Sequence, residues 1–190
     1  MLPCWHCPIA CRRDPVAMLP DWFTPDSHPA PPPAPLFDWL CAEGSLTQRL
    51  TEAGNQDFHV QLLEQCQQPA RQDEALALAV QLNEAVWARE VLLHTDGAAR
   101  VFARTVAPLS ALGSAAMELN KLGTTSLGHL LFRNPQISRG PIEISQYPAH
   151  WLPAEYKANG LWARRSHFSD GQLQLLVCEV FLQGWPCAGT

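Results

Sequence analysis

Two segments of alternating apolar residues, 86–107 and 161–182, each contain an Asp-Gly dipeptide near the middle. This dipeptide between alternating runs is the strongest short-range signal for a β-hairpin with a two-residue turn. The turns are therefore expected at Asp96-Gly97 and Asp170-Gly171. Two antiparallel hairpins account for four strands and restrict the chain to folds built on an antiparallel sheet.

In the first hairpin, counting outward from the turn places Leu92 opposite Val101 and Arg89 opposite Arg104. Like charges directly opposite each other destabilise a ladder of strands. The two guanidinium groups therefore need an anion, which is either a carboxylate of the chain or a ligand. The alternative is that both arginines lie on a solvated face of the sheet, where arginine is common.

In the second hairpin, the same counting places Arg164 opposite Val177 and diagonal to Glu179. Glu179 is the only acidic residue in a largely apolar strand. Burying a carboxylate without a partner is costly, so Glu179 needs a cation. The partner is Arg164, or else Arg89 or Arg104 if the two hairpins share a sheet. A structural ion pair and a functional site both fit this pattern.

The remaining elements are short. Alternation of apolar residues predicts strands at 57–63 and 136–146. Ser45, followed three residues later by Gln48, is typical of a helix start, and Gly54 of a helix end. Short helical segments are predicted at 36–40, 46–53, 74–82, 114–122 and 127–132. Together these elements predict an α+β fold, a single six-stranded antiparallel sheet with short helices over one face.

Residues 1–35 differ in composition from the rest of the chain, because they contain ten of its 17 prolines. Proline disfavours helices and central strands and favours extended polyproline conformations. We therefore expect a disordered N-terminal extension over 1–35 and one domain over 36–190, with Met18 as an alternative start of translation.

Composition and motifs exclude several classes of protein. The net charge of −5 and the pI of about 5.7 argue against a nucleic-acid partner. No apolar run approaches the roughly 18 residues that span a bilayer, and no signal peptide is present, so a cytoplasmic chain without disulfides is expected. The spacing of Cys4, Cys7 and Cys11 suits zinc, yet no second pair completes four ligands, so no metal site is predicted. Motifs for nucleotides, flavins and serine nucleophiles do not occur.

Seven segments of the chain, taken with their order and separations, resemble one known family. They are LFDWL (36–40), GSLT (44–47), WAREVLL (87–93), ARTVAP (103–108), KLGTTSLG (121–128), LWARRS (161–166) and EVFL (179–182). The set is similar to the chorismate pyruvate-lyase family, bacterial enzymes that open ubiquinone biosynthesis by converting chorismate to 4-hydroxybenzoate and pyruvate. The resemblance implies a monomeric lyase without cofactor, whose helices enclose a buried ligand cavity.

The resemblance also implies three catalytic residues. The family's ligand arginine, in its W-x-R-E pattern, falls on Arg89, and the arginine of its R-T-V-x-P pattern falls on Arg104. The glutamate of its E-x-F-L pattern falls on Glu179. We expect Arg89 to bind the ring carboxylate of chorismate and Arg104 the enolpyruvyl carboxylate or the ether oxygen. Glu179 is expected to bind the 4-hydroxyl group and to move the proton.

Two apolar residues complete the implied substrate site. Leu127 follows the K-L-G turn, and Leu46 follows the helix-capping serine. Both are expected to pack against the ring, and the short helices that carry them are candidate lids. His129 occupies a position where relatives carry arginine, and no role is assigned to it.

A rival interpretation is a ligand sensor. The effector-binding domain of one group of bacterial transcription regulators shares the expected fold and binds small anions without turning them over. Those domains normally follow a basic winged-helix segment, and residues 1–35 are too short and too rich in proline to form one. A non-catalytic relative that binds 4-hydroxybenzoate is a third interpretation.

Overall fold

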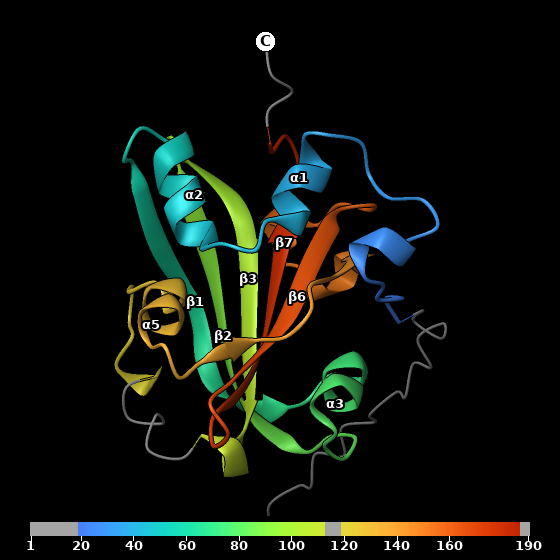
Figure 1. Cartoon of the computed structure of the whole chain (residues 1–190), viewed down its shortest axis with the longest axis vertical. Coiled ribbons are helices and arrows are strands. Elements are labelled where there is room, and N and C mark those ends of the chain that lie inside the picture. The colour runs from blue at the N-terminus through green and yellow to red at the C-terminus, as the bar shows by residue number, and fades with distance from the viewer. Residues whose placement is uncertain (1–18, 113–118, 187–190) are drawn as a thin grey trace, which may run out of the picture.

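A computed structural model describes residues 19–112 and 119–186 of the chain (Figure 1). The helix predicted at 114–122 lies largely outside these ranges, and Met18 and the three cysteines near the N-terminus lie wholly outside them. Within the described ranges, no helix is long and apolar enough to cross a membrane.

The core of the fold is one antiparallel sheet of seven strands, in the order β1-β2-β3-β7-β6-β4, with β5 also paired to β6. The strands are β1 (Phe58–Pro69), β2 (Ala85–Thr95), β3 (Ala98–Pro108), β4 (Ser138–Arg139), β5 (Glu143–Gln146), β6 (Trp162–Ser169) and β7 (Gln174–Phe181). The α+β prediction is confirmed. The sheet has seven strands instead of six because the strand predicted at 136–146 is interrupted at Gly140-Pro141, where proline has no N–H to donate.

The helices are short. They are α1 (Leu36–Cys41), α2 (Leu46–Ala53), α3 (Gln72–Leu78) and α5 (Leu127–Arg133), with 3-10 turns η1 (Pro25–Ser27), η2 (Leu109–Ala111), η4 (Ala149–Trp151) and η5 (Ala154–Tyr156). The predicted start of α2 is confirmed, because the Ser45 side chain accepts a hydrogen bond from the backbone N–H of Gln48 at 3.3 Å. Gly54 follows the helix as its C-cap residue.

Packed residues cover both faces of the sheet, not the single face that the sequence predicted. Leu50 of α2 packs with Val91 of β2 on one face, and Figure 1 shows α2 and α5 in front of the strands. Leu78 of α3 packs with Ala88 of β2 on the other face. Residues 101–108 of β3 are buried without alternation, as expected of a central strand between two covered faces.

A β-bulge in the first hairpin changes the predicted register. The Asp-Gly turn forms as predicted, but the pairing shifts by one residue between Leu93 and His94. Beyond the bulge, Arg89 lies opposite Thr105, so its predicted pairing with Arg104 is wrong. A one-residue shift moves a side chain to the other face of a sheet, and the two arginines therefore lie on opposite faces.

The turn of the second hairpin is longer than predicted, because it spans 170–173 rather than two residues. The Asp170 carboxylate accepts hydrogen bonds from two backbone N–H groups of this turn, at 3.0 and 2.8 Å. Relative to the prediction, the pairing between β6 and β7 is shifted by two residues. A shift of two leaves every side chain on its predicted face of the sheet. Arg164 therefore lies directly opposite Glu179, instead of opposite Val177.

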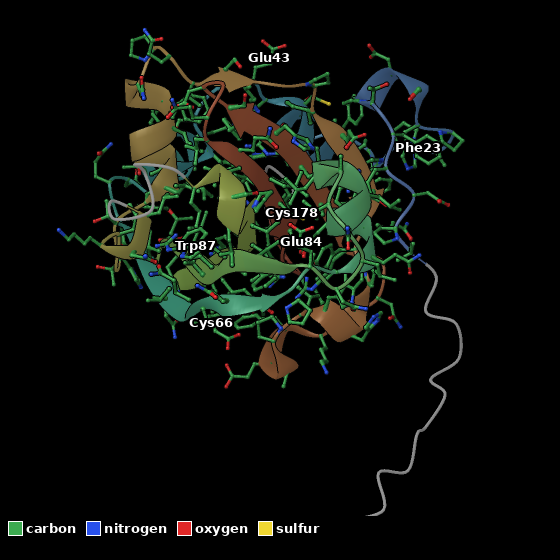
Figure 2. The ribbon with its side chains drawn as sticks, turned by 90° about the horizontal axis from the view of Figure 1, so that it is seen from below. Phe23, Glu43, Cys66, Glu84, Trp87 and Cys178 are labelled. Atoms are coloured by element: carbon green, nitrogen blue, oxygen red, sulfur yellow. The ribbon has the colours of Figure 1, made fainter. Side chains whose placement is uncertain are left out.

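Residues 19–35, which belong to the predicted extension, pack against the domain in the structure. Phe23 forms an antiparallel bridge with Ile144 of β5, and Figure 2 shows Phe23 at one side of the molecule. The indole of Trp22 donates a hydrogen bond to Asp73 of α3 at 3.3 Å. This part of the segment therefore contributes to the covering of the sheet.

Candidate active site

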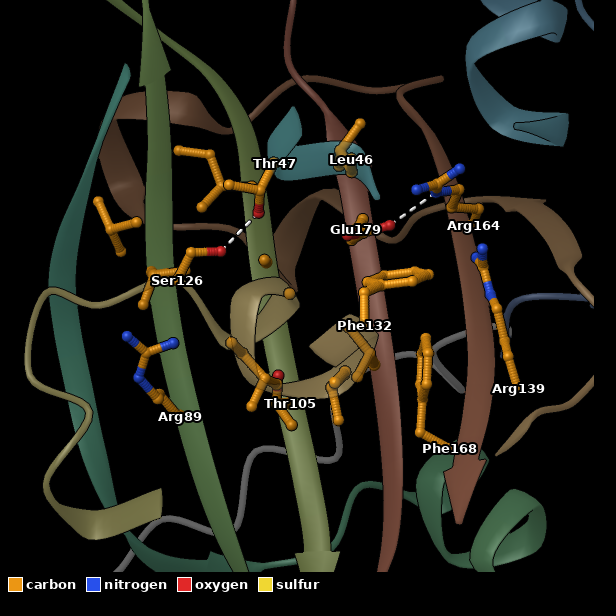
Figure 3. A pocket seen from close by; sticks show the side chains of 18 residues that line it. Leu46, Thr47, Arg89, Thr105, Ser126, Phe132, Arg139, Arg164, Phe168 and Glu179 are labelled. Carbon is orange, nitrogen blue, oxygen red and sulfur yellow. Dashed lines mark hydrogen bonds and ion pairs between the residues drawn. The ribbon is translucent and has the colours of Figure 1, made fainter. Parts of the chain in front are cut away.

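A partly open cavity lies between the sheet and the helices α2 and α5 (Figure 3). Apolar side chains from β1, β2, β6 and α5 form much of its wall, among them Val60, Val91, Leu131 and Phe168. Its charged lining comes from Arg89, Arg139, Arg164 and Glu179.

Arg89 of β2 is a buried cation without a counterion among the described residues. The residue is 2% exposed, and Nη2 donates to the backbone oxygens of Gly123 and Thr125 at 2.9 and 3.1 Å. Nε is buried without a hydrogen-bond partner, and no carboxylate of the described residues lies within 4.0 Å of the guanidinium. Burial lowers the pKa of Arg89 from its ordinary value. An anion bound in the cavity would compensate this charge.

Glu179 of β7 is held by Arg164 on the neighbouring strand β6. Nε of Arg164 donates to Oε2 of Glu179 at 2.6 Å (Figure 3). Nη1 of the same arginine donates to the backbone oxygens of Trp39 and Ala42, at 3.1 and 2.7 Å, where α1 ends. The other carboxylate oxygen of Glu179 has no hydrogen-bond partner among the described residues and is available to a ligand.

Arg139 of β4 enters the cavity from the same side as Arg164 (Figure 3). Nε donates to the Ser166 hydroxyl at 3.0 Å, and Nη1 donates to the backbone oxygen of Glu43 at 2.7 Å. The guanidinium also lies over the Phe168 ring, 5.4 Å from its centroid. Burial and the charge of Arg164 lower the pKa of Arg139.

The helices α2 and α5 close the cavity on the side away from the sheet. Leu46 and Leu127 are both buried and both line the cavity, where the sequence placed them. Thr47 and Ser126 connect the two helices through a hydrogen bond between their hydroxyl groups (Figure 3). Gly128 permits this close approach, because a Cβ atom there would lie 2.9 Å from the Thr47 hydroxyl oxygen.

The family model described as chorismate lyase matches residues 19–187. The chain belongs to the chorismate lyase family. A "Probable chorismate pyruvate-lyase" from Pseudomonas aeruginosa is 50% identical over 148 residues, which are 77% of this chain and 83% of that protein. A protein of the same name from Pseudomonas fluorescens is 49% identical over 140 residues, 74% of this chain and 75% of that protein.

Among solved structures, the effector domain of PhnF from Mycobacterium smegmatis has the same fold as this chorismate lyase family member. The TM-score is 0.53, with 16% sequence identity, over 76% of this chain and 91% of that one. The fold expected of the family is therefore shared with an effector domain, as the rival interpretation stated.

Of the family positions expected in the site, Arg104 lies apart from the others. It is on the far face of β3, where Nη2 donates to Glu74 at 3.0 Å and Nη1 to Glu90 at 2.9 Å. Burial alone would lower the pKa of Arg104, but the two carboxylates outweigh it and raise the pKa. The structure brings Arg89 and Glu179 to one cavity and does not bring Arg104 there.

The sequence identified Arg164 as a possible partner of Glu179, and the structure confirms this pair. Sequence reasoning missed Arg139, because the segment 136–146 was treated as one continuous strand. The signal was Pro141, since a proline within a strand pattern often marks an interruption. The side chain of His129 is outside the part of the chain that the structure describes.

Proposed function

We propose that the chain converts chorismate to 4-hydroxybenzoate and pyruvate, the step that opens ubiquinone biosynthesis in its family. The supporting observation is one cavity with Arg89, which has no counterion among the described residues, on one side and Glu179 on the other (Figure 3). Chorismate carries a carboxylate at one end of its ring and a hydroxyl group at the opposite end. A cation and a hydrogen-bond acceptor across an apolar cavity match these two ends.

Arg89 binds the ring carboxylate. Its Nε and Nη1 make no hydrogen bond to the described residues, so two donors of the guanidinium remain available to a carboxylate. The bonds from Nη2 to two backbone oxygens hold the group in place before the substrate arrives. Such preorganisation reduces the entropy lost on binding.

Glu179 binds the 4-hydroxyl group and takes up the proton of the same ring carbon. Arg164 fixes one oxygen of the carboxylate at 2.6 Å, which leaves the other oxygen to accept from the substrate. A positioned carboxylate of this kind acts as a general base.

The reaction is an elimination driven by aromatisation. The C–H bond at the carbon that carries the hydroxyl group breaks, and its electron pair forms the third double bond of the ring. The adjacent C–O bond breaks with its pair leaving on oxygen, and the released enolpyruvate takes up a proton to become pyruvate. The residues therefore have to position the ring and stabilise developing charge, a task that needs no cofactor.

Leu46 and Leu127 pack against the ring from the helical side and exclude water. All residues of this mechanism come from a single chain, so we propose that it acts as a monomer. Arg104 has no part in the mechanism, because its carboxylate partners on the far face favour a structural role.

The test is to mix the purified chain with chorismate and to follow the absorbance of a new aromatic product and the release of pyruvate. We expect Arg89→Gln to lower kcat/KM by about 30- to 5000-fold, because truncating one partner of a buried charge pair costs about 2–5 kcal/mol. Arg49→Gln is the matched control, since Arg49 also lacks a carboxylate within 4.0 Å but does not line the cavity. Unchanged turnover in Arg89→Gln would remove Arg89 from the site.

The rival function gives a different result in the same experiment. A chain that binds chorismate or 4-hydroxybenzoate tightly without forming product is a sensor of the effector type. That outcome would refute the lyase proposal while leaving the binding roles of Arg89 and Glu179 in place.

A further inference from the structure

Most arginine side chains that the structure describes face a carboxylate. Carboxylate oxygens lie within 4.0 Å of Arg71, Arg100, Arg104, Arg164 and Arg165. Among the described side chains, Arg49, Arg89 and Arg139 have no such partner. Arg89 and Arg139 both line the cavity, on opposite sides of it (Figure 3). The cavity therefore contains two separate cations that no carboxylate of the described residues neutralises.

The charges of the cavity wall match a dianion. The lining contains three arginines and one glutamate, a net charge of +2. Glu179 and Arg164 neutralise each other through a direct hydrogen bond of 2.6 Å. The excess charge is thus divided between Arg89 and Arg139, which favours a ligand with two well-separated anionic groups.

Arg139 is held in a fixed orientation but keeps a free donor. The Ser166 hydroxyl and the backbone oxygen of Glu43 accept from Nε and Nη1, and the Phe168 ring lies beneath the guanidinium. Nη2 has no hydrogen-bond partner among the described residues. Arg164, in contrast, already donates to Glu179 and to two backbone oxygens of the α1 region. Nη2 of Arg164 likewise has no hydrogen-bond partner among the described residues, but the charge of Arg164 is paired with Glu179. Arg139 is therefore the arginine on this side whose charge is left for a ligand.

We propose that Arg139 binds the carboxylate of the enolpyruvyl arm of chorismate. This assignment rests on the proposed function, in which Glu179 contacts the 4-hydroxyl group. The enolpyruvyl ether is on the neighbouring ring carbon, so its carboxylate must lie on the Glu179 side of the cavity and away from Arg89. Arg139 and Arg164 are the cations on that side (Figure 3).

A consequence is that Arg139 distinguishes the substrate from the aromatic product. Chorismate engages both unneutralised arginines, whereas 4-hydroxybenzoate carries a single carboxylate and engages Arg89 alone. Removal of Arg139 therefore weakens the binding of chorismate and leaves the binding of 4-hydroxybenzoate nearly unchanged. A purely structural role for Arg139 predicts that both ligands are affected alike.

The experiment compares Arg139→Gln and Arg89→Gln in two measurements, KM for chorismate and the Kd of 4-hydroxybenzoate from a direct titration. We expect Arg139→Gln to raise KM at least about tenfold while the Kd changes by less than about threefold. Arg89→Gln should raise both values. Arg139→Lys, which keeps the charge but loses the planar fork, should lie between the wild type and Arg139→Gln.

Arg49→Gln is the control and should change neither value. The proposal is overturned if Arg139→Gln leaves KM for chorismate within about threefold of the wild type, or if it weakens 4-hydroxybenzoate as much as chorismate. If Arg139→Gln does not fold, the same comparison is made with Arg139→Lys. If the wild type does not turn chorismate over, the proposed function fails, and the ratio of directly measured Kd values for the two ligands still tests Arg139.

Discussion

Replacing Arg104 by glutamine is expected to destabilise the fold rather than to remove a substrate contact. The Arg104 side chain is 1% exposed, and its guanidinium donates to Glu74 and Glu90 on the face of the sheet opposite the cavity. Without it, the buried Glu74 carboxylate keeps the backbone N–H of Arg71 at 2.9 Å but has no guanidinium within 4.0 Å. Glu90 retains a contact with Arg71 at 3.0 Å. The loss of stability is therefore expected to come mainly from the unpaired charge of Glu74.

The magnitude follows from the burial of this pair. Breaking a buried ion pair by removing one partner costs about 3–5 kcal/mol, because it leaves an uncompensated charge. For a chain of this size, that corresponds to a decrease in Tm of roughly 6–20 °C. The free energy of unfolding is measured by urea titration, and turnover is measured at a temperature at which the variant remains folded. We expect kcat/KM per folded molecule to change less than about threefold.

Two further variants make this test specific. Glu74→Gln combined with Arg104→Gln should recover part of the lost stability, since the double variant leaves no charge in this pair. Arg100→Gln on the same strand is the control, because its partner Asp96 is exposed and 3.9 Å away, and we expect a loss of at most about 1 kcal/mol. If Arg104→Gln is as stable as the wild type and its turnover falls by more than about tenfold, the structural role of Arg104 is refuted and a role in the reaction is supported.

Three other predictions concern the site and the fold. Glu179→Gln should lower kcat by about 10²–10⁴-fold, the usual contribution of a general base, and a smaller loss would exclude that role. Gly128→Ala places a Cβ 2.9 Å from the Thr47 hydroxyl oxygen, and since overpacking costs about 1–3 kcal/mol, we expect a higher Kd for 4-hydroxybenzoate. Burial and the charge of Arg165 lower the pKa of His167 below its ordinary value of 6.5. As the pH drops, the imidazole is therefore protonated in the unfolded chain before it is protonated in the folded chain. The free energy of unfolding consequently falls as the pH drops below 6.5. Urea unfolding of His167→Gln should show a weaker decrease between neutral and mildly acidic pH, and an unchanged pH profile would contradict this.

Local signals located most strands and helices, although β1 continues to Pro69 beyond the predicted 57–63 and α3 ends at Leu78 instead of residue 82. The register did not follow from such signals. Alternation and Asp-Gly turns located both hairpins, since these patterns depend on neighbouring residues alone. The bulge beside His94 and the longer turn at Asp170 depend on contacts across the hairpins, and counting from an ideal turn misses them. The bulge moved Arg104 to the far face, whereas the two-residue shift in the second hairpin preserved the face of Glu179.

The sequence predicted a residue of the candidate site where a charged side chain occurred within an apolar strand. Glu179 stood out as an acid within an apolar strand, and its partner Arg164 was among the candidates. Arg139 belongs to a two-residue strand that has no pattern of its own. The carboxylates that neutralise Arg104 come from α3 and from the residue after Arg89, so only the fold reveals that they meet. Which arginines lack a counterion is a property of the tertiary structure.

The excess positive charge of the unliganded cavity has a practical consequence for measurements. Phosphate or sulfate in a buffer will occupy such a chamber and stabilise the fold by RT ln(1 + [L]/Kd), in competition with the substrate. Melting temperatures and inhibition constants will therefore depend on the choice of buffer salt. Values for different variants are comparable only in one medium whose anions bind weakly, and variants without Arg89 or Arg139 will respond less than the wild type to a change of salt.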